Sequence, residues 1–234
     1  SDAGRQPASG TPAPAAAATA TGANAGEIVI GERVSLRSEI LGEERALLVY
    51  RPPPDGADTP CPVIYLLDGE AHFHHTTGLV QFLMQQGQMP RVMVVGLGNV
   101  DRTRDFTPTH VERLQTSGGA ARFLAFFERE LIPAVEKAYP TARYRVLIGH
   151  SFGGLFAIHM LNQKPDLFDA TISISPSLAW ASGLMQRQTR ALVAAPSADP
   201  GSAPSPVRAS SAAIPSPTAR WSPSTAPRWK ARPA

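Results

Sequence analysis

The sequence predicts an α/β fold, in which helices flank a mainly parallel β-sheet. Two observations support this prediction. Four short runs are apolar at nearly every position, which is typical of strands buried on both faces of a parallel sheet. Segments with helical periodicity separate most of these runs, and an alternation of strand and helix indicates a layered α/β domain.

Six segments have the composition of strands. The first two, Ile28 to Leu36 and Ala46 to Tyr50, precede three consecutive prolines that end the second strand. The four apolar runs follow at Pro62–Leu67, Val92–Val95, Arg145–Ile148 and Thr171–Ile174. Each is closed by a small or turn-forming residue, so each has the length of a single strand.

Three segments have the pattern of helices. Leu79 to Met84 follows the first apolar run, and Leu155 to Leu161 follows the third and ends before Pro165. The longest, Ala120 to Tyr139, has an apolar residue at every fourth position, which predicts one stripe facing the core. These stripe residues are Phe123, Phe127, Leu131 and Val135.

The two ends of the chain differ from its body. Residues 1–26 are rich in Ala, Pro and Thr and have no apolar periodicity, so we expect a disordered leader. Residues 195–234 form a low-complexity tail of Ala, Pro, Ser and Arg, with five basic residues and one acidic residue. The whole chain has a net charge of +3 and the tail +4, which leaves −1 for residues 1–194. Residues 27–194 are therefore the expected folded domain, and it is nearly neutral.

Composition excludes several classes of protein. The basic pI of 9.3 belongs to the tail, so it does not indicate a nucleic-acid partner, which would need clustered Lys and Arg on the folded part. No apolar run approaches the roughly 18 residues that a membrane-spanning helix needs. The single cysteine, Cys61, excludes a disulfide framework and a cysteine-based zinc site, and we expect it to be a packed small residue.

The strongest motif lies between the third apolar run and the helix that follows it. It reads Gly149-His150-Ser151-Phe152-Gly153-Gly154. A serine flanked by glycines in a strand–turn–helix context predicts a nucleophile elbow, in which the tight turn exposes Ser151 Oγ. The backbone N–H of Phe152, at the start of the helix, is then a candidate oxyanion donor. The alternative is a plain glycine-rich turn.

Other candidate site residues follow neighbouring strands. Gly69, after the first apolar run, is the candidate second oxyanion donor, although this could be an ordinary strand-to-helix turn. Arg102 or Arg104, in the loop after the second run, could hold an anionic or polar substrate; alternatively, Arg–Asp pairs fix that loop. His150 is expected to point away from the serine hydroxyl, and it is counted among the candidate substrate-binding residues.

Seven segments together carry a family resemblance. In chain order they are Tyr65–Gly69, Arg102–Pro108, Ser117–Ala120, Phe123–Leu124, Glu130–Pro133, Gly149–Leu155 and Ser175–Trp180. Over about residues 28–190 the chain resembles the α/β-hydrolase superfamily, in its enterochelin-esterase-like and esterase-D-like branch. The resemblance implies hydrolysis of small-molecule carboxylic esters, either siderophore trilactones or small acyl esters, without a cofactor. It also implies that Ser151 is the nucleophile and that Gly69 and Phe152 form the oxyanion region.

The acid and the histidine of a serine hydrolase are not evident. In this fold both follow the serine along the chain, yet only His159 does so, and it lies about 12 Å along the following helix. Asp166 and Asp169 precede the next strand, on the wrong side of the expected position. Three further histidines, His72, His74 and His75, lie near the oxyanion loop. One of them could act as a substitute base, the three could form a metal site, or they could simply line the pocket; we expect no metal.

Because no acid and no histidine are evident after the serine, we expect an incomplete hydrolase. The tail has the composition of GC-rich coding sequence read in a shifted frame, so we expect a truncated or frameshifted hydrolase that lacks its last strands and helices. Such a domain would have a bare sheet edge and impaired catalysis. The alternatives are an acyltransferase on the same fold and a non-catalytic binding protein. The Ala-rich leader without an initiator Met favours a periplasmic or secreted location, with a cytoplasmic one as the alternative. The oligomeric state is not predicted.

Overall fold

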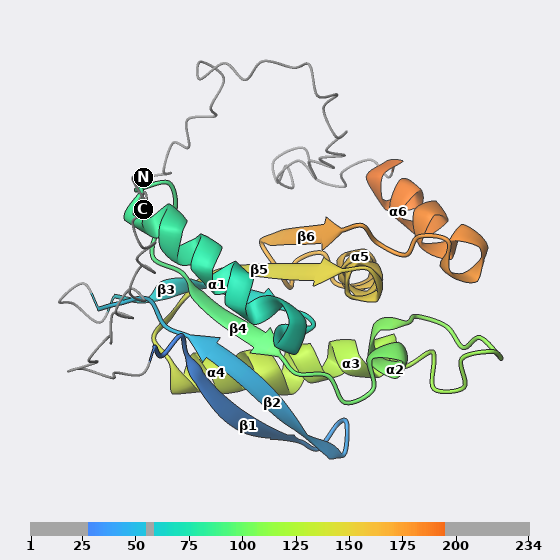
Figure 1. Cartoon of the computed structure of the whole chain (residues 1–234). Helices are drawn as coiled ribbons and strands as arrows, with labels where there is room; N and C mark the ends of the chain where they lie inside the picture. Colours follow the sequence, from blue (N-terminus) through green and yellow to red (C-terminus); the bar gives the residue numbers. More distant parts are fainter. Residues whose placement is uncertain (1–27, 55–58, 195–234) are drawn as a thin grey trace, which may run out of the picture.

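The computed structural model describes residues 28–54 and 59–194 (Figure 1). The predicted leader and the predicted tail both lie outside the described residues. Six strands form one sheet in the order β1-β2-β4-β3-β5-β6. They are β1 (Glu32–Ser38), β2 (Glu43–Tyr50), β3 (Cys61–Leu66), β4 (Met93–Leu97), β5 (Thr141–His150) and β6 (Ala170–Ile174). β1, β2 and β4 pair antiparallel, and β4, β3, β5 and β6 pair parallel, which confirms the mainly parallel α/β prediction.

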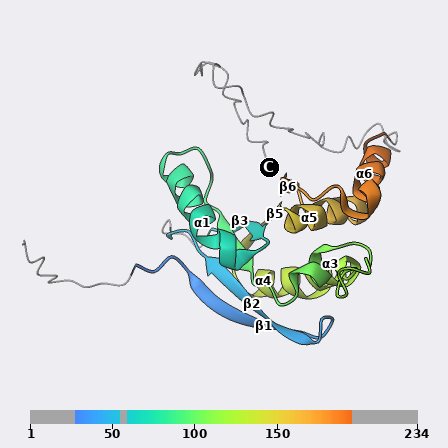
Figure 2. The same ribbon diagram turned by 45° about the vertical axis from the view of Figure 1, so that its right-hand side comes forward.

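Helices cover both faces of the sheet (Figure 2). On one face, α1 (Gly69–Gln85) packs Val80 against Ile64 and Val94. On the other face lie α3 (Ala120–Phe126), the π-helical turn η1 (Phe127–Leu131), α4 (Ile132–Ala138) and α5 (Phe152–Gln163). The remaining helices are the short α2 (Arg102–Phe106), the 3₁₀ turn η2 (Trp180–Gly183) and α6 (Leu184–Ala194).

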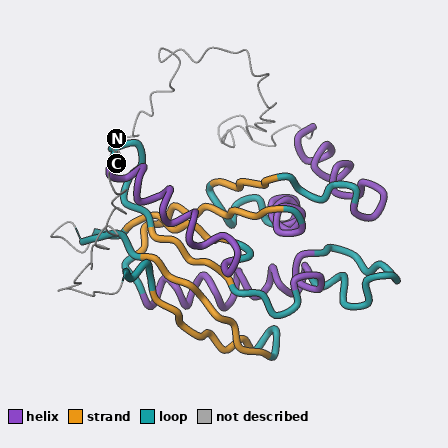
Figure 3. The backbone as a smooth tube through the Cα atoms, viewed as in Figure 1, coloured by secondary structure: helices purple, strands orange, loops and turns teal. Residues whose placement is uncertain are grey.

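The larger core cluster lies between the sheet and the α3–α5 face. The predicted stripe residues Phe123, Phe127, Leu131 and Val135 are all at most 1% exposed, which confirms the apolar face expected for residues 120–139. Figure 3 shows α3, η1 and α4 following one another along a single helical path. Cys61 belongs to the same cluster, and burial raises the pKa of its thiol, as expected of a packed cysteine.

Several boundaries differ from the sequence predictions. α1 begins at Gly69 rather than Leu79, because its first turns contain mostly polar residues that carry no apolar stripe. β1 begins at Glu32, and Ile28 is left 93% exposed. β5 extends back to Thr141, because pairing with β3 can include polar residues at its start. α2, η2 and α6 were not predicted.

β6 lies at the edge of the sheet among the described residues. Two of its apolar side chains, Ile172 and Ile174, are each 46% exposed. Within the described ranges, no helix is both long enough and apolar enough to cross a membrane.

Candidate active site

Ser151 lies at the turn between β5 and α5, in the strand–turn–helix context that the motif predicts. Its backbone has φ 57° and ψ −114°, a conformation that costs a non-glycine residue of order 1–3 kcal/mol and that accumulates at functional sites. Hydrogen bonds hold the serine there: Ser151 N donates to Ile174 O at 3.0 Å, and Leu155 N donates to Ser151 O at 2.9 Å. The strain is therefore maintained by β6 on one side and α5 on the other.

Close backbone contacts explain the glycines of the nucleophile elbow, residues 149–154. A Cβ on Gly149 would lie 2.3 Å from the carbonyl oxygen of Gly153. A Cβ on Gly154 would lie 3.0 Å from Ser173 Oγ and 3.1 Å from Pro176 Cα. Gly149 therefore has no room for a side chain and Gly154 little, so the close turn depends on these glycines.

Two helix N-termini meet at the elbow. β3 and β5 are parallel neighbours, joined at their ends by the hydrogen bond from Leu67 N to Ile148 O at 2.9 Å. β3 ends in left-handed Asp68, with φ 54°, and α1 then begins at Gly69. Ser151 likewise precedes α5, which begins at Phe152. The first N–H groups of a helix have no acceptor within that helix, so those of Gly69 and Phe152 are available at the same sheet edge. Their oxyanion role stays a prediction.

Arg102 binds the protein rather than standing free in the site. Its Nε and Nη2 donate to the two carboxylate oxygens of Asp68 at 2.6 and 3.0 Å, and Nη2 also donates to His150 O at 3.2 Å. The side chain is 33% exposed. These contacts favour the alternative in which an Arg–Asp pair fixes the loop, and the substrate-binding role of Arg102 stays a prediction.

Arg104 is also engaged internally. It donates to Glu43 Oε1 at 2.6 Å and to Asp105 Oδ1 at 2.8 Å, and its hydrogen bond to Asp105 raises the pKa of its guanidinium. Asp105 is 1% exposed and also pairs with Arg45, which is equally buried. This network ties α2 to β2, so the loop-fixing alternative accounts for Arg104 as well, and the substrate-binding role of Arg104 stays a prediction.

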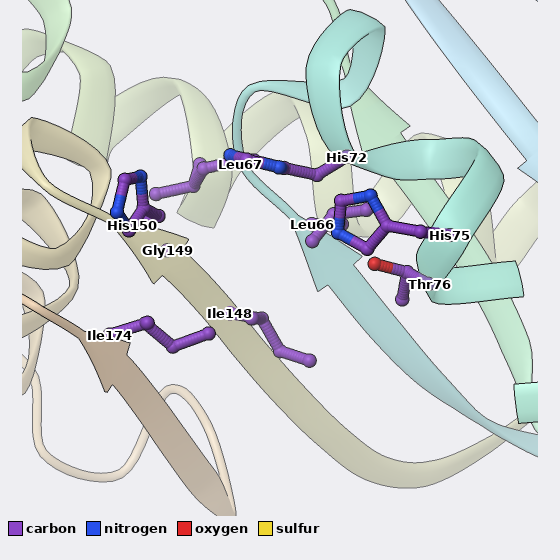
Figure 4. A pocket seen from close by; sticks show the side chains of 9 residues that line it. All are labelled: Leu66, Leu67, His72, His75, Thr76, Ile148, Gly149, His150 and Ile174. Carbon is purple, nitrogen blue, oxygen red and sulfur yellow. The ribbon is translucent and has the colours of Figure 1, made fainter. Parts of the chain in front are cut away.

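Three histidines surround a hollow next to the elbow (Figure 4). His72 and His75 come from α1 and His150 from the end of β5, and the His72 ring lies 5.2 and 5.6 Å from the other two ring centroids. The hollow measures about 250 Å³, with Leu66, Leu67, Thr76, Ile148, Gly149 and Ile174 as the other lining residues. Burial lowers the pKa of His72, although the charge of Asp68 opposes this. His150, predicted to contact substrate, is exposed at this rim.

Within the described ranges, no group of three or more His, Cys, Asp or Glu residues is arranged to hold a metal ion.

A model of the family described as "Putative esterase" matches residues 38–234 of the chain. The chain belongs to this esterase family. Its relatives include the ferri-bacillibactin esterase BesA of Bacillus subtilis, 35% identical over 162 residues, which cover 59% of this chain and 54% of the relative. The siderophore triacetylfusarinine C esterase of Aspergillus fumigatus is 32% identical over 146 residues, covering 57% of this chain and 50% of that protein.

A solved structure supports the same assignment. The IroE-like serine hydrolase from Shewanella oneidensis is 38% identical, superposes with a TM-score of 0.67 and covers 70% of this chain and 56% of its own. The chain thus has the α/β-hydrolase fold, and the curated relatives that it resembles are named siderophore esterases. The 234-residue chain spans about half the length of the curated relatives that it matches.

Among the described residues, the side-chain hydrogen bond of the Ser151 hydroxyl is to Ser177. Its Oγ lies 3.4 Å from Ser151 Oγ, and its N–H donates to Ser151 O at 3.2 Å. Sequence reasoning gave Ser177 no role. The available signal was its place just after β6, at the same edge of the sheet as the elbow.

His159 and Asp169 have packing and structural roles in the described part of the chain. His159 is buried in α5 with no hydrogen-bond partner on either ring nitrogen, and burial lowers its pKa. His159 therefore packs within the fold, against its neighbours on α5. Asp169 Oδ2 accepts from the backbone N–H of Arg145 at 2.8 Å, which is a structural role between β5 and β6.

Proposed function

We propose that this esterase hydrolyses carboxylic esters of small molecules through Ser151 as the nucleophile. The observation that carries the proposal is the strained backbone of Ser151 at the point where the N-termini of α1 and α5 meet. A serine held in this way presents its Oγ beside two sets of free backbone N–H groups. Attack on an ester carbonyl needs this arrangement, because negative charge then develops on the carbonyl oxygen.

The reaction proceeds in two stages. Ser151 Oγ forms a bond to the ester carbonyl carbon and loses its proton, while the electron pair of the C=O bond moves onto the oxygen. The N–H groups of Gly69 and Phe152 donate to that oxyanion. The tetrahedral intermediate then expels the alcohol, which takes up a proton, and leaves an acyl-serine. Water attacks this acyl-serine by the same route, releasing the acid and restoring the serine.

The names of the relatives indicate a class of substrate for this chain. Both curated relatives are siderophore esterases, and siderophore esters are small molecules. We therefore propose siderophore esters as the substrate class of this chain, with small acyl esters as convenient assay substrates.

We further propose that the 234-residue polypeptide turns over slowly. A serine needs a base to remove its proton, and among the described residues Ser151 Oγ is hydrogen-bonded to Ser177 rather than to a histidine. The elbow and the helix N-termini remain, so Ser151 keeps its exposed position and its expected oxyanion donors. Solvent hydroxide is then the acceptor of the Ser151 proton.

The pH dependence of p-nitrophenyl acetate hydrolysis tests this proposal. We expect the rate, after subtraction of spontaneous hydrolysis, to rise about tenfold per pH unit between pH 6 and 9, because hydroxide removes the proton. The Ser151→Ala variant should lose this activity. A rate that levels off near pH 7 would instead reveal an imidazole base and contradict the proposed impairment.

In the described part, the hydrogen bond of Ser151 Oγ goes to Ser177 and not to a histidine, and this also favours a second candidate, a non-catalytic member of the family that keeps the pocket. The same assay separates the two. Equal rates for the unaltered chain and Ser151→Ala at every pH would rule out the esterase proposal and support the non-catalytic one.

A further inference from the structure

Arg102 joins the two backbone segments that carry the expected oxyanion donors. Its guanidinium binds both carboxylate oxygens of Asp68, the residue immediately before Gly69. The same Nη2 atom donates to the carbonyl of His150, two residues before Phe152. One side chain therefore connects the start of α1 to the start of α5.

Two aromatic rings hold this guanidinium in place. Its central carbon lies 5.4 Å from the ring centroids of both Phe106 and Phe152, which is within cation–π distance. Phe152 itself packs edge-on against Trp180, with ring centroids 5.5 Å apart. The direction of Arg102 is thus fixed by packing as well as by hydrogen bonds.

The charge of Arg102 matters because Asp68 is buried. The Asp68 side chain is 6% exposed, and apart from Arg102 it accepts a hydrogen bond from Asn99 Nδ2 at 2.8 Å. A buried carboxylate without its cation would place uncompensated negative charge next to the expected oxyanion. Arg102 therefore does two things: it aligns the two helix starts and neutralises Asp68.

We propose that Arg102 is a positioning residue for ester hydrolysis rather than a substrate-binding residue. It holds the N–H groups of Gly69 and Phe152 in the relative position that the oxyanion needs. This inference rests on the proposed function. It predicts that loss of Arg102 lowers kcat while leaving KM nearly unchanged, because the guanidinium does not contact the substrate. Loss of a residue that bound the substrate equally in its ground and transition states would raise KM instead.

The experiment compares four variants with p-nitrophenyl acetate at pH 8. Arg102→Gln should lower kcat about 100-fold with KM within about twofold, as expected when oxyanion donors are misplaced. Arg102→Lys keeps the charge but loses the two-pronged contact, so its kcat should be intermediate. Asp68→Asn combined with Arg102→Gln should recover at least about fivefold over Arg102→Gln alone, because the uncompensated charge is gone. The control is Arg145→Gln, which breaks the ion pair between Arg145 on β5 and Glu136 on α4 and should leave kcat within about twofold.

A second measurement does not depend on activity. In ¹⁵N-labelled protein, the amide signals of Gly69 and Phe152 should shift or broaden in Arg102→Gln and Arg102→Lys but not in Arg145→Gln. Unchanged Gly69 and Phe152 signals would overturn the positioning role. So would a raised KM with unchanged kcat, or a double variant no faster than Arg102→Gln. Failure of the proposed function has a different signature, namely hydrolysis that Ser151→Ala leaves intact; in that event the amide signals alone decide the role of Arg102.

Discussion

Replacement of Gly149 by alanine is the sharpest perturbation of the nucleophile elbow. The added Cβ would lie 2.3 Å from the carbonyl oxygen of Gly153 and 2.4 Å from its carbonyl carbon. Comfortable carbon contacts begin at about 3.5 Å, so the overlap exceeds about 1 Å. Both obstacles are backbone atoms at the start of α5, so relief requires the turn itself to move. We expect a loss of stability of about 1–3 kcal/mol, typical of overpacking.

The same displacement should reach the chemistry. A shift of about 1 Å at Ser151 is enough to lower a catalysed rate by about 100-fold. The assay is the Ser151-dependent hydrolysis of p-nitrophenyl acetate, measured together with urea unfolding of the same preparation. Gly149→Ala should remain folded in water and hydrolyse the ester about 100-fold more slowly than the unaltered chain.

Gly78 provides the matched control. It lies inside α1, and a Cβ there would meet nothing within 4 Å. Gly78→Ala should therefore stabilise the protein by about 0.5–1 kcal/mol through helix propensity and leave the hydrolysis rate unchanged. If Gly149→Ala and Gly78→Ala hydrolyse the ester at the same rate, the turn does not position the nucleophile as we infer.

Two further predictions concern buried ionisable side chains. Asp105→Ala should lower the free energy of unfolding by about 3–5 kcal/mol in urea titrations, because it removes a partner of Arg45, which is 1% exposed; Glu39→Ala, which breaks an exposed 3.8 Å pair with Arg37, should change it by less than about 1 kcal/mol. Burial lowers the pKa of His159 in the native state, so below pH 6.5 the unfolded chain binds a proton that the native state does not. The free energy of unfolding should therefore decrease as the pH is lowered below 6.5, by up to about 1.4 kcal/mol per pH unit. His159→Leu should remove this component, and an identical pH dependence in both proteins would refute it.

The fold was largely predictable because its signals are local. Each parallel strand contains a short apolar run, and the stripe from Phe123 to Val135 lies on consecutive turns. The elbow was predictable for the same reason, since its glycines, its serine and the flanking strand and helix are contiguous. α2 was missed because its five residues, Arg102–Phe106, are mostly polar and too few to show a period.

The partners of the candidate arginines could not be predicted in this way. Arg104 pairs with Glu43, which is 61 positions away, and Arg102 pairs with Asp68, which is 34 positions away. The order of the strands brings each pair together, and no pattern within one segment encodes that order. Ser177 came to lie beside Ser151 for the same reason, because the end of β6 is next to the end of β5.

Covalent labelling of Ser151 tests the central claim most directly. A fluorophosphonate probe forms a bond from Ser151 Oγ to phosphorus, and fluoride leaves as the serine proton passes to solvent. After incubation at pH 9, peptide mass spectrometry should find one adduct, on Ser151, with a rate that rises with pH and no adduct in Ser151→Ala. Ser177, whose hydroxyl lies 3.4 Å away, provides an internal comparison. A folded chain that acquires no adduct, or one on Ser177 instead, would contradict the assignment of Ser151 as the nucleophile.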